Sequence, residues 1–101
     1  MAEGETKSEL ETRRNKLRFR AQRRGFKEVD LVFGAFAVAH LDHLDEVQLD
    51  RFEALLGVPD WLIYDWLAGY DEPPNEFDTD VFHLLRDYRK NIDLKEGAWN
   101  G

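Results

Sequence analysis

The chain has 101 residues, of which 43% are hydrophobic and 13% aromatic, and its formal net charge is −7. This length and composition predict one domain with a hydrophobic core and exclude global disorder. The lack of cysteine excludes disulfides and thiolate metal sites. No apolar run approaches the roughly 20 residues that a membrane span needs, so we expect no membrane partner.

The pattern of apolar residues predicts an all-α protein, a compact bundle of about five short helices. We expect residues 1–7 to be disordered, residues 8–91 to form a single helical domain and residues 92–101 to form an irregular C-terminal tail. The tail contains one large apolar group, Trp99, whose role stays open. The sequence demands no more than a monomer.

The first helix is expected to extend to Arg24 with only a thin apolar stripe. Residues 13–27 carry eight Lys and Arg side chains and no acid, whereas residues 28–101 carry five basic and 17 acidic side chains. Such a separation can steer a partner into one orientation, and an arginine-rich helix is also typical of nucleic-acid binding. The acidic remainder argues against a long nucleic acid, because it would repel the phosphates.

The second helix, residues 27–41, is apolar nearly all round. We therefore expect it to be the central helix, covered by the others, with Gly34 allowing a close approach of another helix. The later helices are bounded by residues that favour caps and turns. We expect the third helix to lie between Asp45, paired with Gln48, and Gly57, the fourth between Asp60 and Gly69, and the fifth to open at Asp78 or Thr79.

No metal site is predicted. His40 and His43 share a helix face and have Asp42 and Asp45 nearby, but they precede a turn and lack a third clear ligand. His83 is expected to lie on the surface of the last helix.

No catalytic residue is predicted either. The sole serine is Ser8, and there is no cysteine to act as a nucleophile. Glu28 and Asp30 stand two apart on a helix and point away from each other, which makes them a poor acid–base pair. No Gly-x-Gly element or βαβ pattern is present to bind a flavin or a nucleotide.

The corner between the first two helices carries the most distinctive motif. It reads Arg24-Gly25-Phe26-Lys27-Glu28-Val29-Asp30. Gly25 stands where a helix commonly ends in left-handed backbone, and the two carboxylates suit the positive end of the next helix. This arrangement is also ordinary helix capping. It groups a guanidinium, a tight turn, Phe26 and two carboxylates into a compact recognition surface.

The motif Arg-Gly-x-x-Glu-x-Asp has a companion downstream. Phe52-x-x-Leu55-Leu56 is followed by the run Asp60-Trp61-Leu62-Ile63-Tyr64-Asp65-Trp66-Leu67. The two patterns, in this order and spacing, resemble those of the flavinylation-factor family, and the likeness extends from about Arg13 to Asn91. Spacing alone places Trp66 and Leu67 in the core and leaves Trp61 and Tyr64 as possible surface residues.

The resemblance implies an assembly factor, not an enzyme. Such a factor would bind the flavoprotein subunit of succinate dehydrogenase or fumarate reductase and promote covalent attachment of FAD. The FAD would belong to that partner, and this chain would bind no cofactor tightly. We assign partner-binding roles to the motif: charge-assisted hydrogen bonds, close backbone approach, orientation and an apolar anchor. The residues are Arg24, Gly25, Phe26, Glu28 and Asp30, of which Phe26 is our own addition to the family motif.

Two alternatives stay open at this point: a nucleic-acid-binding regulator that uses the basic arm 13–27, and a helical adaptor with no link to flavin. The resemblance places an assembly factor in the bacterial cytoplasm, or in the mitochondrial matrix if the chain is a processed eukaryotic form.

Overall fold

The segments with a short apolar stripe form helices, as the sequence predicts, and glycine or proline residues lie between several of them. The computed structural model describes residues 7–22 and 26–96, with side chains described for 9–22 and 26–91. Within these residues there is no strand. The elements are α1 (Lys7–Ala21), α2 (Lys27–His40), η1 (Leu41–His43), α3 (Glu46–Leu56), α4 (Asp60–Ala68), η2 (Asn75–Phe77) and α5 (Asp80–Glu96).

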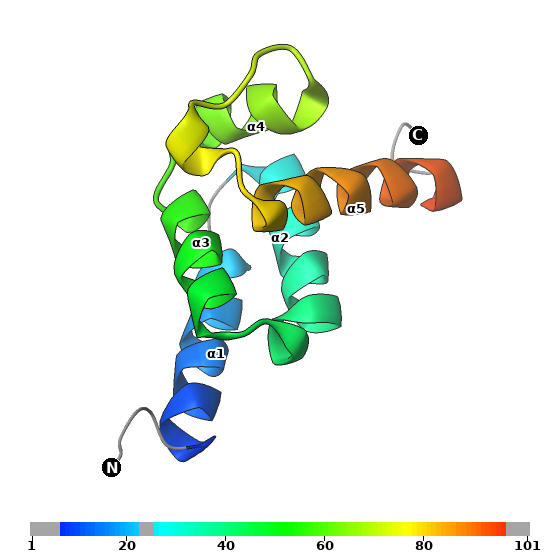
Figure 1. Ribbon diagram of the computed structural model, residues 1–101. Helices are drawn as coiled ribbons and strands as arrows, with labels where there is room; N and C mark the ends of the chain where they lie inside the picture. Colours follow the sequence, from blue (N-terminus) through cyan, green and yellow to red (C-terminus); the bar gives the residue numbers. More distant parts are fainter. Residues whose placement is uncertain (1–6, 23–25, 97–101) are drawn as a thin grey trace.

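The helices are arranged around α2. It contacts α1, α4 and α5, while α3 contacts α1 and α5 (Figure 1). α4 lies at the end of the molecule opposite the start of α1. None of the described helices is long and apolar enough to cross a membrane.

The core is a single cluster of buried aliphatic and aromatic side chains. The ring centroid of Phe52 lies 5.7 Å from those of both Phe33 and Phe36, which joins α3 to α2. Trp66 and Leu67 are buried, which confirms that they are core residues. Among the described side chains no polar or charged residue is buried, so the core is held by apolar burial alone.

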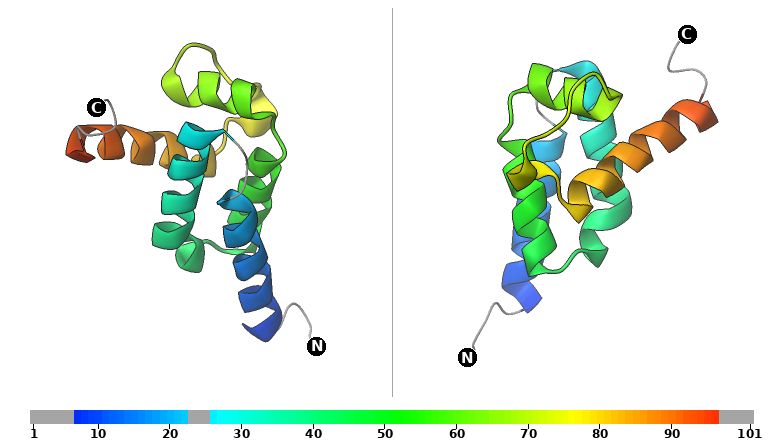
Figure 2. Two further views of the ribbon diagram at one scale, coloured as in Figure 1. Left: turned by 180° about the vertical axis from the view of Figure 1, so that it is seen from behind. Right: turned by 45° about the horizontal axis from the view of Figure 1, so that its top comes forward.

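The prediction that the other helices cover α2 on every side is wrong. The expected cover is incomplete, because Leu31 and Val38 are 46% and 67% exposed. A Cβ on Gly34 would lie 3.2 Å from Cγ of Gln22, so the residue that follows α1 approaches α2 closely there. The remaining helices pack on the opposite side, and Figure 2 (left) shows α1 and α2 side by side with no helix over them. The surrounding helices therefore leave Leu31 and Val38 of α2 in solvent.

The caps agree with the sequence at most positions. Asp45 and Gln48 form the predicted capping box. Gly57 follows α3, and Gly69 ends α4 in left-handed backbone at φ 86°. The hydroxyl of Thr79 accepts a hydrogen bond from the Phe82 amide at 3.3 Å, so Thr79 opens α5.

The prediction that Asp60 caps α4 is wrong. Pro59 holds the cap position in extended backbone, and its carbonyl accepts from the amides of Leu62 and Ile63. Asp60 is consequently the first helical residue, where its carboxylate still suits the positive end of the helix.

The start of the predicted irregular tail also needs correction. α5 continues to Glu96, five residues beyond the expected boundary. Residues 92–96 contain good helix formers and neither glycine nor proline, so nothing in the backbone ends the helix before Gly97. The expected disorder of the first residues, the rest of the tail and Trp99 lie outside the described residues.

One carboxylate ties α5 to α3. Asp80 accepts hydrogen bonds from Gln48 at 3.0 Å, from Arg51 at 2.8 Å and from the Val81 amide at 2.8 Å. The hydrogen bond from Gln48, together with that from Arg51, lowers the pKa of Asp80 below its usual range. Because the folded-state pKa is depressed, Asp80 stabilises the fold above the pKa of an unfolded aspartate, and this contribution is lost as the pH falls.

We expect Asp80→Asn to reduce stability at neutral pH by less than about 1 kcal/mol, since the pair is half exposed and screened by solvent. The difference should begin to shrink below about pH 4, the pKa of an unfolded aspartate, and the variant and the parent should converge only once the pH has fallen below the depressed folded-state pKa. Urea unfolding between pH 7 and pH 2 measures both effects. Asp87→Asn, an exposed carboxylate on the same helix, is the control, and parallel pH profiles for parent and Asp80→Asn would refute the assignment.

Candidate functional site

The first turn of α2, the face of α4 and the far half of α5 meet at one corner of the molecule. There Nη2 of Arg89 lies 3.1 Å from Oε2 of Glu28. The two side chains retain 18% and 31% of their exposure, so the pair is half-buried. Glu28 thus stands at the surface with a partner from its own chain. Sequence reasoning missed Arg89, because 61 residues separate it from Glu28 and no local pattern connects them.

Three aromatic rings lie beside this ion pair. The ring of Phe26 meets that of Tyr64 edge-on, with centroids 5.5 Å apart. Tyr64 in turn lies 6.3 Å from Tyr70, which follows α4. Phe26 is 39% exposed and Tyr70 is 74% exposed. We call Phe26, Glu28, Tyr64, Tyr70 and Arg89 the motif corner.

The Glu28 carboxylate is the main electrostatic influence on Tyr64. The pKa of the Tyr64 phenol is raised above its ordinary value, chiefly by the carboxylate of Glu28. Burial, Tyr70 and Asp65 raise it further, and Arg89 offsets part of the effect. The Glu28 carboxylate therefore acts on Tyr64 as well as on Arg89.

The structure places three of the five predicted site residues. Phe26 and Glu28 belong to the motif corner, and Asp30 is half-buried in the first turn of α2, where its amide donates to the Phe26 carbonyl at 2.8 Å. Arg24 and Gly25 lie outside the described residues. Trp61 is exposed and Tyr64 half-buried, so sequence reasoning identified two surface candidates without connecting them to the motif.

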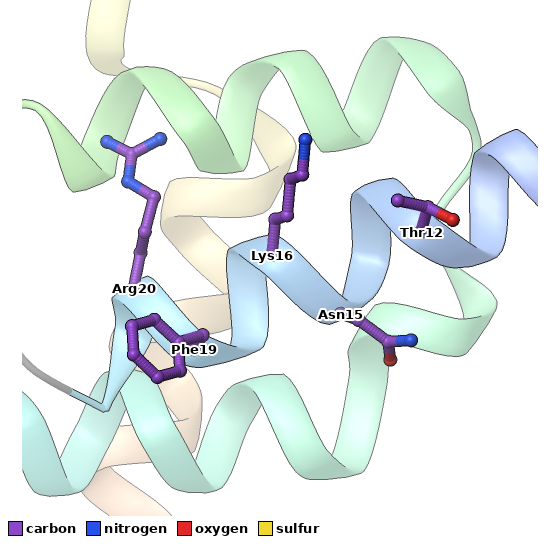
Figure 3. Close-up of a pocket in the computed structure, with 5 residues that line it drawn as sticks. All are labelled: Thr12, Asn15, Lys16, Phe19 and Arg20. Carbon is purple, nitrogen blue, oxygen red and sulfur yellow. The ribbon is translucent and has the colours of Figure 1, made fainter.

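Four arginines of the basic arm are engaged within the fold. Arg13 pairs with Asp50 at 2.6 Å and with Glu53 at 3.1 Å. Arg20 lies 3.3 Å from Glu53, as the direction of its side chain toward α3 in Figure 3 suggests. Arg18 pairs with Asp42, and Arg14 donates to the carbonyls of Leu41 and Leu44 at 2.9 and 2.8 Å. These arginines fasten α1 to α3 and η1.

The outer surface of α1 carries a shallow groove of about 430 Å³. Phe19 lies in the foreground of this groove in Figure 3 and is 59% exposed. The groove is lined by Thr12, Asn15, Lys16, Phe19 and Arg20.

The histidines have aromatic or acidic neighbours. The ring of His40 lies 4.8 Å from that of Phe36 and 5.6 Å from that of Tyr88. His83 is exposed, with Nε2 2.7 Å from Oδ1 of Asp78. Across the described part of the chain, no three His, Asp or Glu side chains gather as they would around a metal ion.

Comparison with known proteins adds a family to this geometry. Residues 15–89 match the family model described as the flavinator of succinate dehydrogenase. The chain belongs to this family. The matched residues include the motif, α4 and Arg89, so all parts of the motif corner lie within the shared domain.

Relatives in three lineages carry the name succinate dehydrogenase assembly factor 2, mitochondrial, or its 2-A form. The chain is 39% identical to that of Dictyostelium discoideum over 87 residues, covering 86% of this chain and 62% of the relative. It is 36% identical to that of Drosophila yakuba, covering 83% and 53%. It is 37% identical to that of Meyerozyma guilliermondii, covering 89% and 67%. The chain thus spans between about half and two thirds of the length of these family members.

The effect of the Glu28 carboxylate on the pKa of Tyr64 can be measured. We expect Glu28→Gln to lower the pKa of Tyr64 toward the ordinary tyrosine value of about 10, because the largest cause of the raised pKa is removed. Titration of specifically labelled tyrosine rings by NMR resolves Tyr64 from Tyr70 and Tyr88. An unchanged Tyr64 pKa in the variant would show that the carboxylate does not lie beside the phenol.

Proposed function

We propose that this protein binds the flavoprotein subunit of succinate dehydrogenase through the motif corner and promotes covalent attachment of FAD to it. Membership of the flavinator family is the observation that carries the proposal. The structure supports it by showing that Glu28 of the family-like motif and the neighbouring Phe26 are accessible at the surface beside an exposed aromatic ring. Tyrosine, tryptophan and arginine are the residues that most often dominate protein–protein interfaces.

In this proposal the chain acts on the conformation of its partner. FAD and the histidine that receives it belong to the flavoprotein, which supplies the reacting groups. By binding the form of the flavoprotein in which the two are within reach, the factor raises the population of that form. Its own residues bind and orient, and Glu28 can form charge-assisted hydrogen bonds to the partner while Arg89 holds it in place.

The named relatives also bear on location. All three are called mitochondrial, which favours the mitochondrial matrix over the bacterial cytoplasm for this protein. They are named for succinate dehydrogenase, and fumarate reductase remains a second possible source of the flavoprotein partner.

The nucleic-acid alternative loses its main support. Phosphate binding requires cations that face a polymer, whereas Arg13, Arg18 and Arg20 pair with carboxylates of α3 and η1. The helical adaptor without a flavin link is an outcome of the following experiment.

Deletion of the gene should abolish the fluorescent band of the flavoprotein subunit on a denaturing gel, because only covalently bound flavin survives denaturation. Re-expression of the parent chain should restore the band, and Glu28→Ala should restore less than about a tenth of it. We expect Glu28→Ala to reduce stability by about 1 kcal/mol through loss of the ion pair, which leaves the domain folded. A normal band in the deletion strain would favour the adaptor.

Two control variants separate docking from stability. Arg89→Met breaks the same ion pair but leaves the Glu28 carboxylate available, so it should lose similar stability and retain more flavinylation than Glu28→Ala. Glu46→Ala removes an exposed carboxylate from the first turn of α3, away from the motif corner, and should behave as the parent. If Arg89→Met and Glu28→Ala lose flavinylation equally, Glu28 serves the fold and makes no contact with the partner.

A further inference from the structure

The most exposed aromatic side chains of the described residues gather on and after α4. Trp61, Tyr64 and Ala68 are spaced three and four residues apart, so they follow one stripe of the helix. Trp61 is 66% exposed, and Tyr70, whose ring lies 6.3 Å from that of Tyr64, is 74% exposed. Figure 2 (right) shows α4 and the segment after it at one end of the molecule, where they are accessible.

The turn after α4 holds these groups in a defined arrangement. Gly69 adopts left-handed backbone, and the amides of Tyr70 and Asp71 both donate to the carbonyl of Asp65, at 2.9 and 3.3 Å. The side chain of Asp71 then accepts from the amide of Glu72 at 3.0 Å. An exposed ring and exposed carboxylates therefore stand next to one another on a hydrogen-bonded turn.

The segment that contains this surface carries charge of one sign. Residues 52–82 contain eight Asp and Glu side chains and neither lysine nor arginine. Asp65 and Glu28 are close enough to Tyr64 to raise the pKa of its phenol. Among the described residues, the guanidinium that acts on Tyr64 is that of Arg89, which is paired with Glu28.

Aromatic rings flanked by carboxylates are suited to a cation. A guanidinium or ammonium over a tyrosine or tryptophan face is attracted by the ring quadrupole, and carboxylates beside the ring add charge complementarity. Arginine fits better than lysine, because its planar group stacks on rings while it donates to carboxylates. An acidic partner would be repelled by these carboxylates. A purely apolar partner would desolvate them without supplying a hydrogen bond or an opposite charge.

We propose that Trp61, Tyr64 and Tyr70, with Asp65 and Asp71, form a docking face for an arginine-bearing segment of a partner protein. We call this set the α4 face. It shares Tyr64 and Tyr70 with the motif corner, so a partner seated on one reaches the other. The identification of the partner as the flavoprotein subunit rests on the proposed function, whereas the chemistry of the α4 face does not.

The first test uses a peptide probe that is independent of the flavoprotein. The ¹⁵N-labelled full chain is titrated with a hexa-arginine peptide at two salt concentrations, with hexa-lysine and hexa-glutamate peptides for comparison. We expect saturable shifts at the Trp61 indole and the Tyr70 amide, with arginine binding several-fold tighter than lysine and no binding of glutamate. Tyr70→Leu should weaken arginine binding about fivefold to tenfold, and Tyr70→Phe should preserve it, because only the second variant keeps the ring face.

Two results would overturn the proposal. One is equal affinity of the parent and Tyr70→Leu for hexa-arginine. The other is a set of shifts spread over the carboxylates of α3 and α5 with none at Trp61, which would indicate non-specific attraction to an acidic protein. Val47→Ala, an exposed apolar residue of α3, controls for general loss of surface.

The second test uses the purified flavoprotein subunit. If the parent binds it and Tyr70→Leu binds about tenfold more weakly with Tyr70→Phe unchanged, the α4 face is part of that interface. If Tyr70→Leu binds the flavoprotein as the parent does, the α4 face proposal fails while the proposed function stands. If the peptide test succeeds and the parent chain does not bind the flavoprotein, the proposed function fails while the α4 face stands.

Discussion

The packing of α2 against α5 determines where the charged residues of the motif corner lie. Phe36 of α2 contacts Tyr88 of α5 edge-on, with ring centroids 5.8 Å apart. Arg89 is the next residue after Tyr88, and it meets Glu28, which stands two turns before Phe36 on α2. Apolar burial supplies most of the free energy that holds the two helices together, and the ion pair at the edge is aligned as a consequence.

The segregation of charge along the chain has two different structural outcomes. Three arginines of α1, Arg13, Arg18 and Arg20, pair with carboxylates of α3 and η1 and so fasten the bundle. The acidic segment that includes α4 has few cations of its own and remains accessible at the opposite end of the molecule. The acidic segment, residues 52–82, thus includes Trp61 and Tyr70, the two most exposed aromatic side chains of the described residues.

This distribution is consistent with a protein that acts by binding. Among the described residues the titratable groups serve capping, ion pairs between helices and exposed surface, and the core contains only apolar side chains. Members of the flavinator family share this domain over residues 15–89 of the chain. The accessible rings and half-buried charges at the junction of three helices support the proposed recognition role, which simple helix capping would not require.

The sequence by itself determined the helices and their family. Apolar periodicity, the capping box at Asp45 and the glycines at 57 and 69 are local signals, because each depends on backbone geometry within a few residues. The two motifs sufficed to indicate the family, which the comparison confirmed. Local signals are weaker at boundaries, so the cap of α4 and the end of α5 were misplaced by the same reasoning.

Only the tertiary structure decided which surfaces are available. The exposure of Leu31 and Val38, the pairing of Glu28 with Arg89 and the engagement of the α1 arginines all depend on contacts between segments distant in sequence. A helical pattern specifies which side chains share a face, but it does not specify which neighbouring helix covers that face. Tyr64 and Tyr70 came together with Phe26 for the same reason, because the packing of α4 on α2 is set by the whole core.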